Sequence, residues 1–216
     1  MISGDTLTQP AFLPLYWTAC YLLGAVPFGF LAGRVFAGID IRAVGSGNIG
    51  ATNVLRTLGP LPAVLVLVLD AAKGWLAVAG AQWLGFGDWG TAGAALAAAA
   101  GHNWPVFLAF RGGRGIATAL GVLIAMAPQV AGILVGVFVA VVALTRYVSL
   151  GSIIAAVLVP VLLALGNRPL PHVVAGITLA VWAVWRHRPN IARLLAGTEH
   201  RFGQRVDPHK PAAPPR

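Results

Sequence analysis

Three stretches rich in Gly, Asn, His and Arg interrupt an otherwise apolar sequence. Residues 45–58 read GSGNIGATNVLRTL, residues 101–118 read GHNWPVFLAFRGGRGIAT, and residues 186–203 read RHRPNIARLLAGTEHRFG. Glycines let backbone N–H groups point at a bound anion, and an arginine can hold a phosphate through two hydrogen bonds. These residue types together indicate a site for anionic, phosphate-bearing ligands.

The first stretch begins with a G-x-G-x-x-G pattern over residues 45–50. This pattern indicates dinucleotide binding only between a strand and a helix, whereas here it lies between two apolar segments. We therefore interpret this stretch as an anion-binding loop. In this interpretation Ser46 and Asn48 donate hydrogen bonds and Arg56 binds a phosphate. A glycine-rich connector with an arginine beside the membrane is an equally good interpretation.

The second stretch carries Arg111 and Arg114 around a glycine pair, directly before an apolar segment. It resembles a phosphate cradle in composition but lacks the G-x-x-x-x-G-K-[ST] pattern of P-loop proteins. We favour anion binding over the alternative of two basic anchors on a flexible turn. His102 either faces the same pocket or caps a helix end.

In the third stretch, Asn190 and Arg193 share one face of a short helix at i, i+3 spacing. Arg186 and Arg188 are equally well explained as anchors at the membrane surface. Glu199 is one of the few acids near these loops, which favours pairing with an arginine over catalysis. No cluster of His, Cys and carboxylates has metal-ligand spacing, so we predict no metal site.

The composition of the 216-residue chain indicates an integral membrane protein. Apolar residues make up 58% and charged residues only 10%, against roughly 25% charged residues in soluble domains. The net charge of +9 comes from basic residues between apolar segments. Such residues report membrane topology and contacts with anionic lipids, and we predict no nucleic-acid partner.

The apolar segments predict seven membrane helices. Residues 115–145 would form a single helix of about 46 Å, too long for a hydrocarbon core of roughly 30 Å. Ala127-Pro128 lies near the middle of this segment, and proline removes a backbone donor, so we divide it there. The predicted spans cover residues 11–36, 60–84, 89–105, 115–145 as two helices, 148–165 and 170–185.

The basic residues support this division. With the N-terminus outside, all of the 15 Lys and Arg residues except Arg168 and Lys73 fall on the cytoplasmic side. We therefore predict an all-α polytopic protein whose C-terminus is cytoplasmic and whose three polar stretches share that face. Residues 1–203 form a single membrane domain, and the proline-rich residues 204–216 form a disordered cytoplasmic tail.

Asp70 and Lys73 lie inside the second predicted span, at i, i+3 spacing. Placing a charge at that depth in a membrane costs free energy, so such charges are usually functional or paired with each other. We favour a structural ion pair slightly over a role with substrate.

The three stretches together resemble the motifs of bacterial membrane acyltransferases that use acyl phosphate and glycerol 3-phosphate. The family patterns GSGN-x-GATN…R, GH…P…F-[KR]-GG-[KR]-G-x-AT and RHR-x-NI-x-RL…GTE occur here in order. Arg111 and Arg114 stand where the family usually has lysine. The resemblance implies transfer of an acyl group from acyl phosphate to the 1-hydroxyl of glycerol 3-phosphate. Lysophosphatidic acid and inorganic phosphate are the implied products, formed at the cytoplasmic face of the bacterial inner membrane in the first step of phospholipid synthesis.

The resemblance also implies roles for individual residues. The first stretch binds and orients phosphate, the glycine loop cradles the acyl phosphate, His187 and Asn190 position glycerol 3-phosphate, and Glu199 holds the third stretch. The general base is His187, His102 or a substrate phosphate, and we favour the phosphate. The resemblance implies that the catalytic residues are Ser46, His187 and Asn190. The implied substrate-binding residues are Asn48, Arg56, His102, Gly112, Gly113, Arg114, Gly115, Thr118, Arg193 and Glu199. The resemblance likewise implies no cofactor.

Two other classes of protein would use similar residues. A membrane transporter of an organic phosphate or other anion also needs arginines, but its binding groups should lie near the bilayer centre. A non-catalytic scaffold would use basic loops only to hold anionic lipids. For the protein itself we predict membrane lipids as partners and no obligate protein partner.

Overall fold

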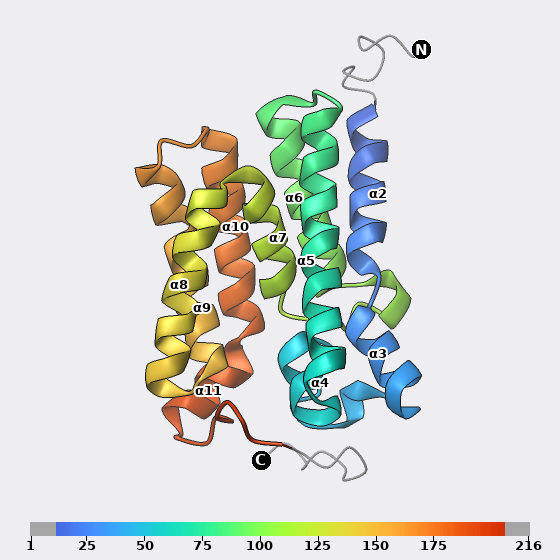
Figure 1. The fold of residues 1–216 in the computed structure, drawn as a ribbon. Coiled ribbons are helices and arrows are strands. Elements are labelled where there is room, and N and C mark those ends of the chain that lie inside the picture. The colour runs from blue at the N-terminus through green and yellow to red at the C-terminus, as the bar shows by residue number, and fades with distance from the viewer. Residues whose placement is uncertain (1–11, 206–216) are drawn as a thin grey trace.

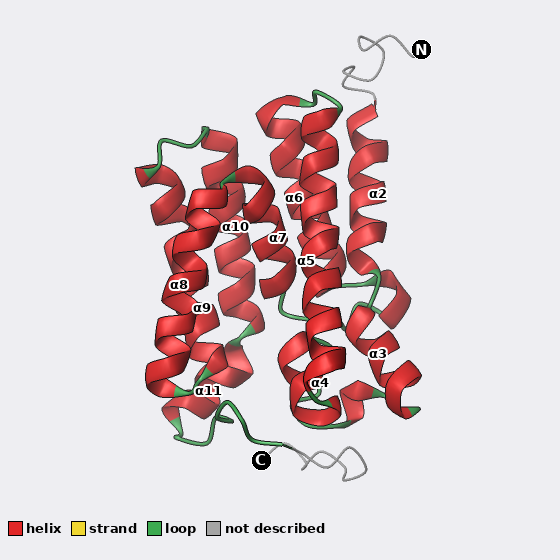
Figure 2. Cartoon of the chain, viewed as in Figure 1, coloured by secondary structure: helices red, strands yellow, loops and turns green. Residues whose placement is uncertain are grey.

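The computed structural model describes residues 12–205, and within that range the chain folds into helices without a β-strand (Figure 2). Residues 206–216 of the predicted tail lie outside the described residues. The elements in chain order are α2 (Leu13–Ala25), α3 (Phe28–Ala37), η2 (Ile41–Ala43), α4 (Ala51–Leu58), α5 (Pro60–Trp83), α6 (Gly87–Asn103), η3 (Val106–Leu108), α7 (Ile116–Met126), α8 (Pro128–Thr145), α9 (Val148–Leu165), α10 (Leu170–Arg186) and α11 (Arg188–Leu195).

The predicted division at Ala127-Pro128 is confirmed. Ala127 has φ −155° and ψ 71°, outside the helical region, and Pro128 is the first residue of α8. Proline suits that position because the first N–H of a helix has no intrahelical partner. The first predicted span is likewise interrupted, since α2 ends at Ala25 and α3 begins after Pro27.

Four helical segments in the described range are long and apolar enough to cross a membrane: Leu13–Ala37, Pro60–Trp83, Pro128–Thr145 and Val148–Leu165. Two shorter helices, α7 and α10, are also apolar. Figure 1 shows the long helices side by side, with α3, α4 and α11 gathered at the lower end of the bundle. The short amphipathic helices therefore occupy one end of the molecule.

Close contact between α5 and α7 depends on two glycines. A Cβ atom on Gly74 would lie 2.1 Å from the Thr118 carbonyl oxygen, and one on Gly121 would lie 1.8 Å from the Ala71 carbonyl oxygen. Small residues let the backbones of membrane helices approach closely. This packing fixes the start of α7, which follows the second polar stretch.

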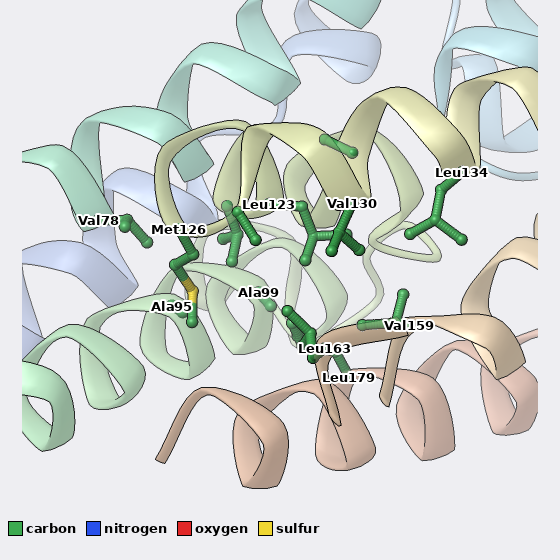
Figure 3. Packing of buried hydrophobic residues seen from close by; sticks show 13 residues of the cluster. Val78, Ala95, Ala99, Leu123, Met126, Val130, Leu134, Val159, Leu163 and Leu179 are labelled. Atoms are coloured by element: carbon green, nitrogen blue, oxygen red, sulfur yellow. The ribbon is translucent and has the colours of Figure 1, made fainter. Parts of the chain in front are cut away.

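The main apolar core joins α7 to its neighbours away from the polar end. Figure 3 shows this core, in which residues of α5 to α10 meet. A second apolar cluster lies beneath the first polar stretch and packs η2 and α4 against α5. The second cluster contains Ala32, Ile41, Ile49, Val54, Ala63, Val66 and Leu108.

Candidate active site

The first polar stretch is organised around the buried side chain of Asn53. Its Nδ2 donates to the carbonyl oxygens of Ile41, Val44 and Asn48 at 3.1, 3.1 and 2.9 Å. Its Oδ1 accepts the Ser46 N–H at 2.9 Å. One amide thus ties the loop to the preceding 3-10 helix and fixes the backbone at Ser46.

Two glycines let the loop turn around that amide. Gly45 and Gly47 have φ of +62° and +69°, a region that favours glycine. Asn48 Oδ1 then accepts the Gly50 N–H at 2.7 Å, directly before α4. Ser46 and Asn48 line a cavity of about 130 Å³, so this stretch is an ordered loop rather than a plain connector.

Arg56 and Arg114 line the same cavity, and within residues 12–205 neither has a carboxylate at ion-pair distance. Burial lowers the pKa of Arg56, and burial together with the charge of Arg193 lowers the pKa of Arg114 to about 10. Both guanidinium groups stay charged at neutral pH. Because buried charges are normally paired, this cavity suits an anion.

The glycine loop of the second stretch, Gly112-Gly113, packs tightly against the C-terminal end of α6. The Gly113 N–H donates to the His102 carbonyl oxygen at 3.0 Å. A Cβ on Gly113 would lie 2.0 Å from His102 Nε2, and one on Gly112 would lie 2.2 Å from the His102 carbonyl oxygen. His102 and the loop therefore form one packed unit.

The residues predicted to bind the acyl phosphate head (Gly112, Gly113, Arg114, Gly115 and Thr118) do not all line one cavity. Gly115 lines the cavity, Gly112 lines an adjoining hollow of about 670 Å³, and Arg114 lines both. Gly113 and Thr118 line neither of them. Thr118 is fully buried, and its backbone lies against Gly74, so it packs α7 on α5 instead of facing the cavity.

Glu199 connects the third stretch to α9. Its Oε1 accepts from Ser149 Oγ at 2.8 Å and from Asn190 Nδ2 at 2.7 Å, and its Oε2 accepts from Arg193 Nε at 2.7 Å. These hydrogen bonds outweigh the effect of burial and lower the pKa of Glu199. The predicted pairing with an arginine is confirmed, with Arg193 as the partner.

His187 is buried at the junction of α10 and α11 and lines the cavity. Its Nδ1 lies 2.7 Å from the Ala183 carbonyl oxygen. Because a carbonyl oxygen only accepts, Nδ1 carries the hydrogen and Nε2 is left as an acceptor. Burial, with the charge of Arg114, lowers the pKa of His187 to about 4, so the ring is neutral at neutral pH.

Asp70 and Lys73 form a buried pair beneath the cavity, with Lys73 Nζ 2.7 Å from Asp70 Oδ1. Lys73 Nζ also donates to the Val26 carbonyl oxygen at 3.1 Å. Asp70 Oδ1 lies 3.5 Å from His102 Nδ1, and both residues line the cavity. The predicted ion pair is confirmed, and it reaches the glycine loop through His102.

An apolar groove of about 270 Å³ adjoins the polar cavity between α7, α8, α9 and α10. Leu67, Ile116, Ala117, Phe138 and Ser152 line both. The site therefore offers a cationic, hydrogen-bonding compartment directly beside a hydrocarbon-lined one.

Comparisons with known proteins agree with these features. The family model described as glycerol-3-phosphate acyltransferase matches residues 14–197. This chain belongs to the glycerol-3-phosphate acyltransferase family. A glycerol-3-phosphate acyltransferase of Synechococcus sp. (strain CC9902) is 48% identical over 86% of this chain and 92% of its own. One from Moorella thermoacetica is 51% identical over 86% and 95%.

Two crystal structures of PlsY (YgiH), an integral membrane glycerol 3-phosphate acyltransferase, share this fold. The glycerol 3-phosphate form has a TM-score of 0.86 and 41% identity, covering 88% of this chain and 96% of the other. The lysophosphatidic acid form has a TM-score of 0.83 and 40% identity, covering 89% and 96%. This acyltransferase family member is thus an all-α, multi-pass integral membrane enzyme.

Sequence reasoning missed three residues that shape the acyltransferase site. Asn53 lies within the first motif, in the first turn of α4, and an asparagine near a helix start is a usable signal, since its side chain competes for backbone hydrogen bonds. Ser149 begins an apolar segment and gave no signal. The sequence explains Arg186 equally well as an anchor at the membrane surface, and does not predict its contact with the glycine loop. Within residues 12–205, no group of three His, Cys, Asp or Glu residues could hold a metal ion.

Proposed function

We propose that this chain transfers a fatty acyl group from acyl phosphate to the 1-hydroxyl of glycerol 3-phosphate, giving lysophosphatidic acid and inorganic phosphate. The adjacency of the polar cavity and the apolar groove is the observation that carries this proposal. An acyl phosphate has a dianionic head joined to a hydrocarbon chain, and these two compartments match its two parts.

The unpaired arginines hold the phosphates. Arg114 and the N–H groups at the start of α7 bind the acyl phosphate head, because a helix N-terminus attracts anions. Arg56, Ser46 and Asn48 bind and orient phosphate from the opposite wall. Both substrates are anionic, so their binding neutralises the buried guanidinium charges.

Because acyl phosphate is already an activated acyl donor, the enzyme mainly has to align the 1-hydroxyl of glycerol 3-phosphate with the acyl carbonyl carbon. The 1-hydroxyl oxygen bonds to the acyl carbonyl carbon, the bond from that carbon to the phosphate oxygen breaks, and the departing phosphate takes the hydroxyl proton. His187 Nε2 accepts a hydrogen bond from the hydroxyl and Asn190 orients the glycerol, while Glu199 holds Asn190. Holding two reactants in this geometry supplies much of the rate enhancement.

We also propose seven membrane spans formed by α2 with α3, α5, α6, α7, α8, α9 and α10. The N-terminus lies outside, and the site faces the cytoplasm at the inner membrane of a bacterium. The basic residues at the end that holds α4 and α11 support this orientation. Residues 1–203 form one membrane domain.

The decisive experiment uses purified protein in detergent with acyl phosphate and glycerol 3-phosphate. We expect lysophosphatidic acid to form without coenzyme A or a divalent metal. Ser46→Ala should abolish turnover although no charge is lost, whereas a lipid-binding scaffold would be unaffected. Uptake of phosphate compounds into proteoliposomes without acyl transfer would instead support a transporter and reject the proposal.

A further inference from the structure

Arg186 binds the backbone of the glycine loop instead of the membrane surface. Its Nη2 donates to the Gly112 carbonyl oxygen at 2.6 Å and its Nε donates to the Gly113 carbonyl oxygen at 2.9 Å. Arg188 differs, because its guanidinium stacks over the Trp185 ring at 4.5 Å. The two arginines that the sequence could not tell apart therefore have different contacts.

The two carbonyl groups depend on Arg186. Within the described residues, no other hydrogen bond reaches the carbonyl oxygen of Gly112 or of Gly113. One planar guanidinium can satisfy two successive carbonyls along one edge, which the point charge of a lysine cannot do with the same geometry. The Gly112 carbonyl is also oriented by its own peptide, because the Gly113 N–H donates to the His102 carbonyl oxygen. Within the described residues, Arg186 is therefore the one side chain that fixes the direction of the Gly113 carbonyl.

The direction of these carbonyls decides what the loop presents to the cavity. In a planar trans peptide the N–H points opposite to the C=O. Arg186 and Arg114 both line the wider hollow, and Arg114 and Gly115 line the cavity. Because the Gly113 carbonyl is hydrogen-bonded to Arg186, the Arg114 N–H of the same peptide points away from Arg186, and a cation offsets the partial negative charge of that carbonyl.

Other contacts also hold the glycine loop in place. Trp104, at the start of the loop, packs against Trp182 and Trp185 of α10 with ring centroids 5.2 and 5.9 Å apart. The Gly113 N–H is fixed by the His102 carbonyl oxygen. Arg186 is thus the polar contact that locks the loop to α10.

We propose that Arg186 is a positioning residue that sets the orientation of the Gly113–Arg114 peptide so that the loop can bind the phosphate of the acyl donor. Its kinetic consequence rests on the proposed function. The matched variants are Arg186→Gln, Arg186→Lys and Arg186→Ala, with Arg188→Gln as the control that removes the neighbouring charge.

Kinetics in detergent should separate the two arginines. We expect Arg186→Gln to raise the KM for acyl phosphate at least about tenfold, or 1.4 kcal/mol, with a smaller fall in kcat. Arg186→Lys should recover only part of this loss, and Arg188→Gln should change the KM less than about threefold. Equal effects of Arg186→Gln and Arg188→Gln would overturn the proposal, because charge alone would then explain both.

Two further measurements test the proposal even if a variant has little activity. Added guanidinium ion should restore activity to Arg186→Ala, whereas sodium at the same ionic strength should not. Hydrogen exchange, which needs no turnover, should accelerate at residues 110–116 in Arg186→Gln but not in Arg188→Gln. Unchanged exchange and no guanidinium rescue would reject the role of Arg186, while absence of product from the wild type would reject the proposed function instead.

Discussion

At the scale of single residues, a buried amide and a buried imidazole fix the positions of the hydrogen-bonding groups around the cavity. Asn53 and His187 are each at most 2% exposed, and each has its hydrogen-bonding direction fixed by backbone carbonyl groups. Neither side chain is charged at neutral pH, so their contribution comes from geometry. Substitutions that preserve size but change donors and acceptors should therefore be damaging.

We predict that Asn53→Asp destabilises the protein although its side chain is nearly isosteric. The Nδ2 donor would be replaced by an oxygen facing three carbonyl oxygens, and each orphaned buried group costs about 1–3 kcal/mol. The midpoint of thermal unfolding in detergent should fall, as it should for Asn53→Ala. A wild-type midpoint for Asn53→Asp would show that the amide contacts are unimportant.

We predict a pH-dependent stability contribution from His187. Burial lowers its folded-state pKa from 6.5 to about 4, so between these values the unfolded chain binds more protons and stability falls as the pH falls. Unfolding midpoints at about pH 7 and about pH 5 should differ less in His187→Gln than in the wild type. Equal differences in the two proteins would contradict the lowered pKa.

At the scale of elements, the second motif depends on how closely α7 approaches α5. The first turn of α7 carries Ile116 and Ala117, which line the cavity, and Thr118, which contacts Gly74 of α5. Any increase in the distance between these helices should move the cavity-lining start of α7, where we propose that phosphate binds.

We therefore predict that Gly121→Ala lowers stability and activity together. Its new methyl group would overlap the Ala71 carbonyl oxygen, and overpacking of this kind costs about 1–3 kcal/mol. Gly136→Ala on α8 is the matched control, since its Cβ would meet nothing within 4 Å. Unfolding midpoints and kcat/KM measure both effects, and equal behaviour of the two variants would argue against tight packing as the cause.

At the scale of the whole molecule, residues of α5 and of α7 to α10 line the apolar groove, which we propose holds the acyl chain, beside the polar cavity. Ala156 of α9 lines this groove, whereas its neighbour Val157 is 51% exposed on the outer surface. Ala156→Phe should fill the groove and raise the KM for long-chain acyl phosphate more than tenfold, since each displaced methylene is worth about 0.8 kcal/mol. Val157→Phe should leave this KM near the wild-type value. Chain-length profiles that are alike in both variants would place the acyl chain elsewhere.

The proposed orientation makes a second prediction at this scale. In a Cys20→Ala background, single cysteines replacing Ala43, Arg111 or Thr198 should react with a membrane-impermeant maleimide only from the cytoplasmic side. A cysteine replacing Asn167, in the turn between α9 and α10, should react only from outside. Labelling of one of the first three from the opposite side would contradict a common active-site face.

The fold was largely predictable because hydrophobic length and proline position are local properties. The break at Ala127-Pro128 and the bounds of α9 follow from runs of apolar residues that must satisfy their own backbone hydrogen bonds in a bilayer. Positions within the site were less predictable. Thr118 follows the glycine loop in sequence, yet it faces α5, because the rotation of α7 depends on packing against Gly74.

The helical membrane fold, the three motifs and the family could be predicted from the amino-acid sequence, because each depends on residues that are near one another along the chain. The folded arrangement was needed to show that Asn53 holds the first loop, that Ser149 binds Glu199 and that Arg186 binds the glycine loop while Arg188 does not. Each of these contacts depends on the direction in which a side chain leaves its helix or loop. That direction is set by packing between segments distant in sequence.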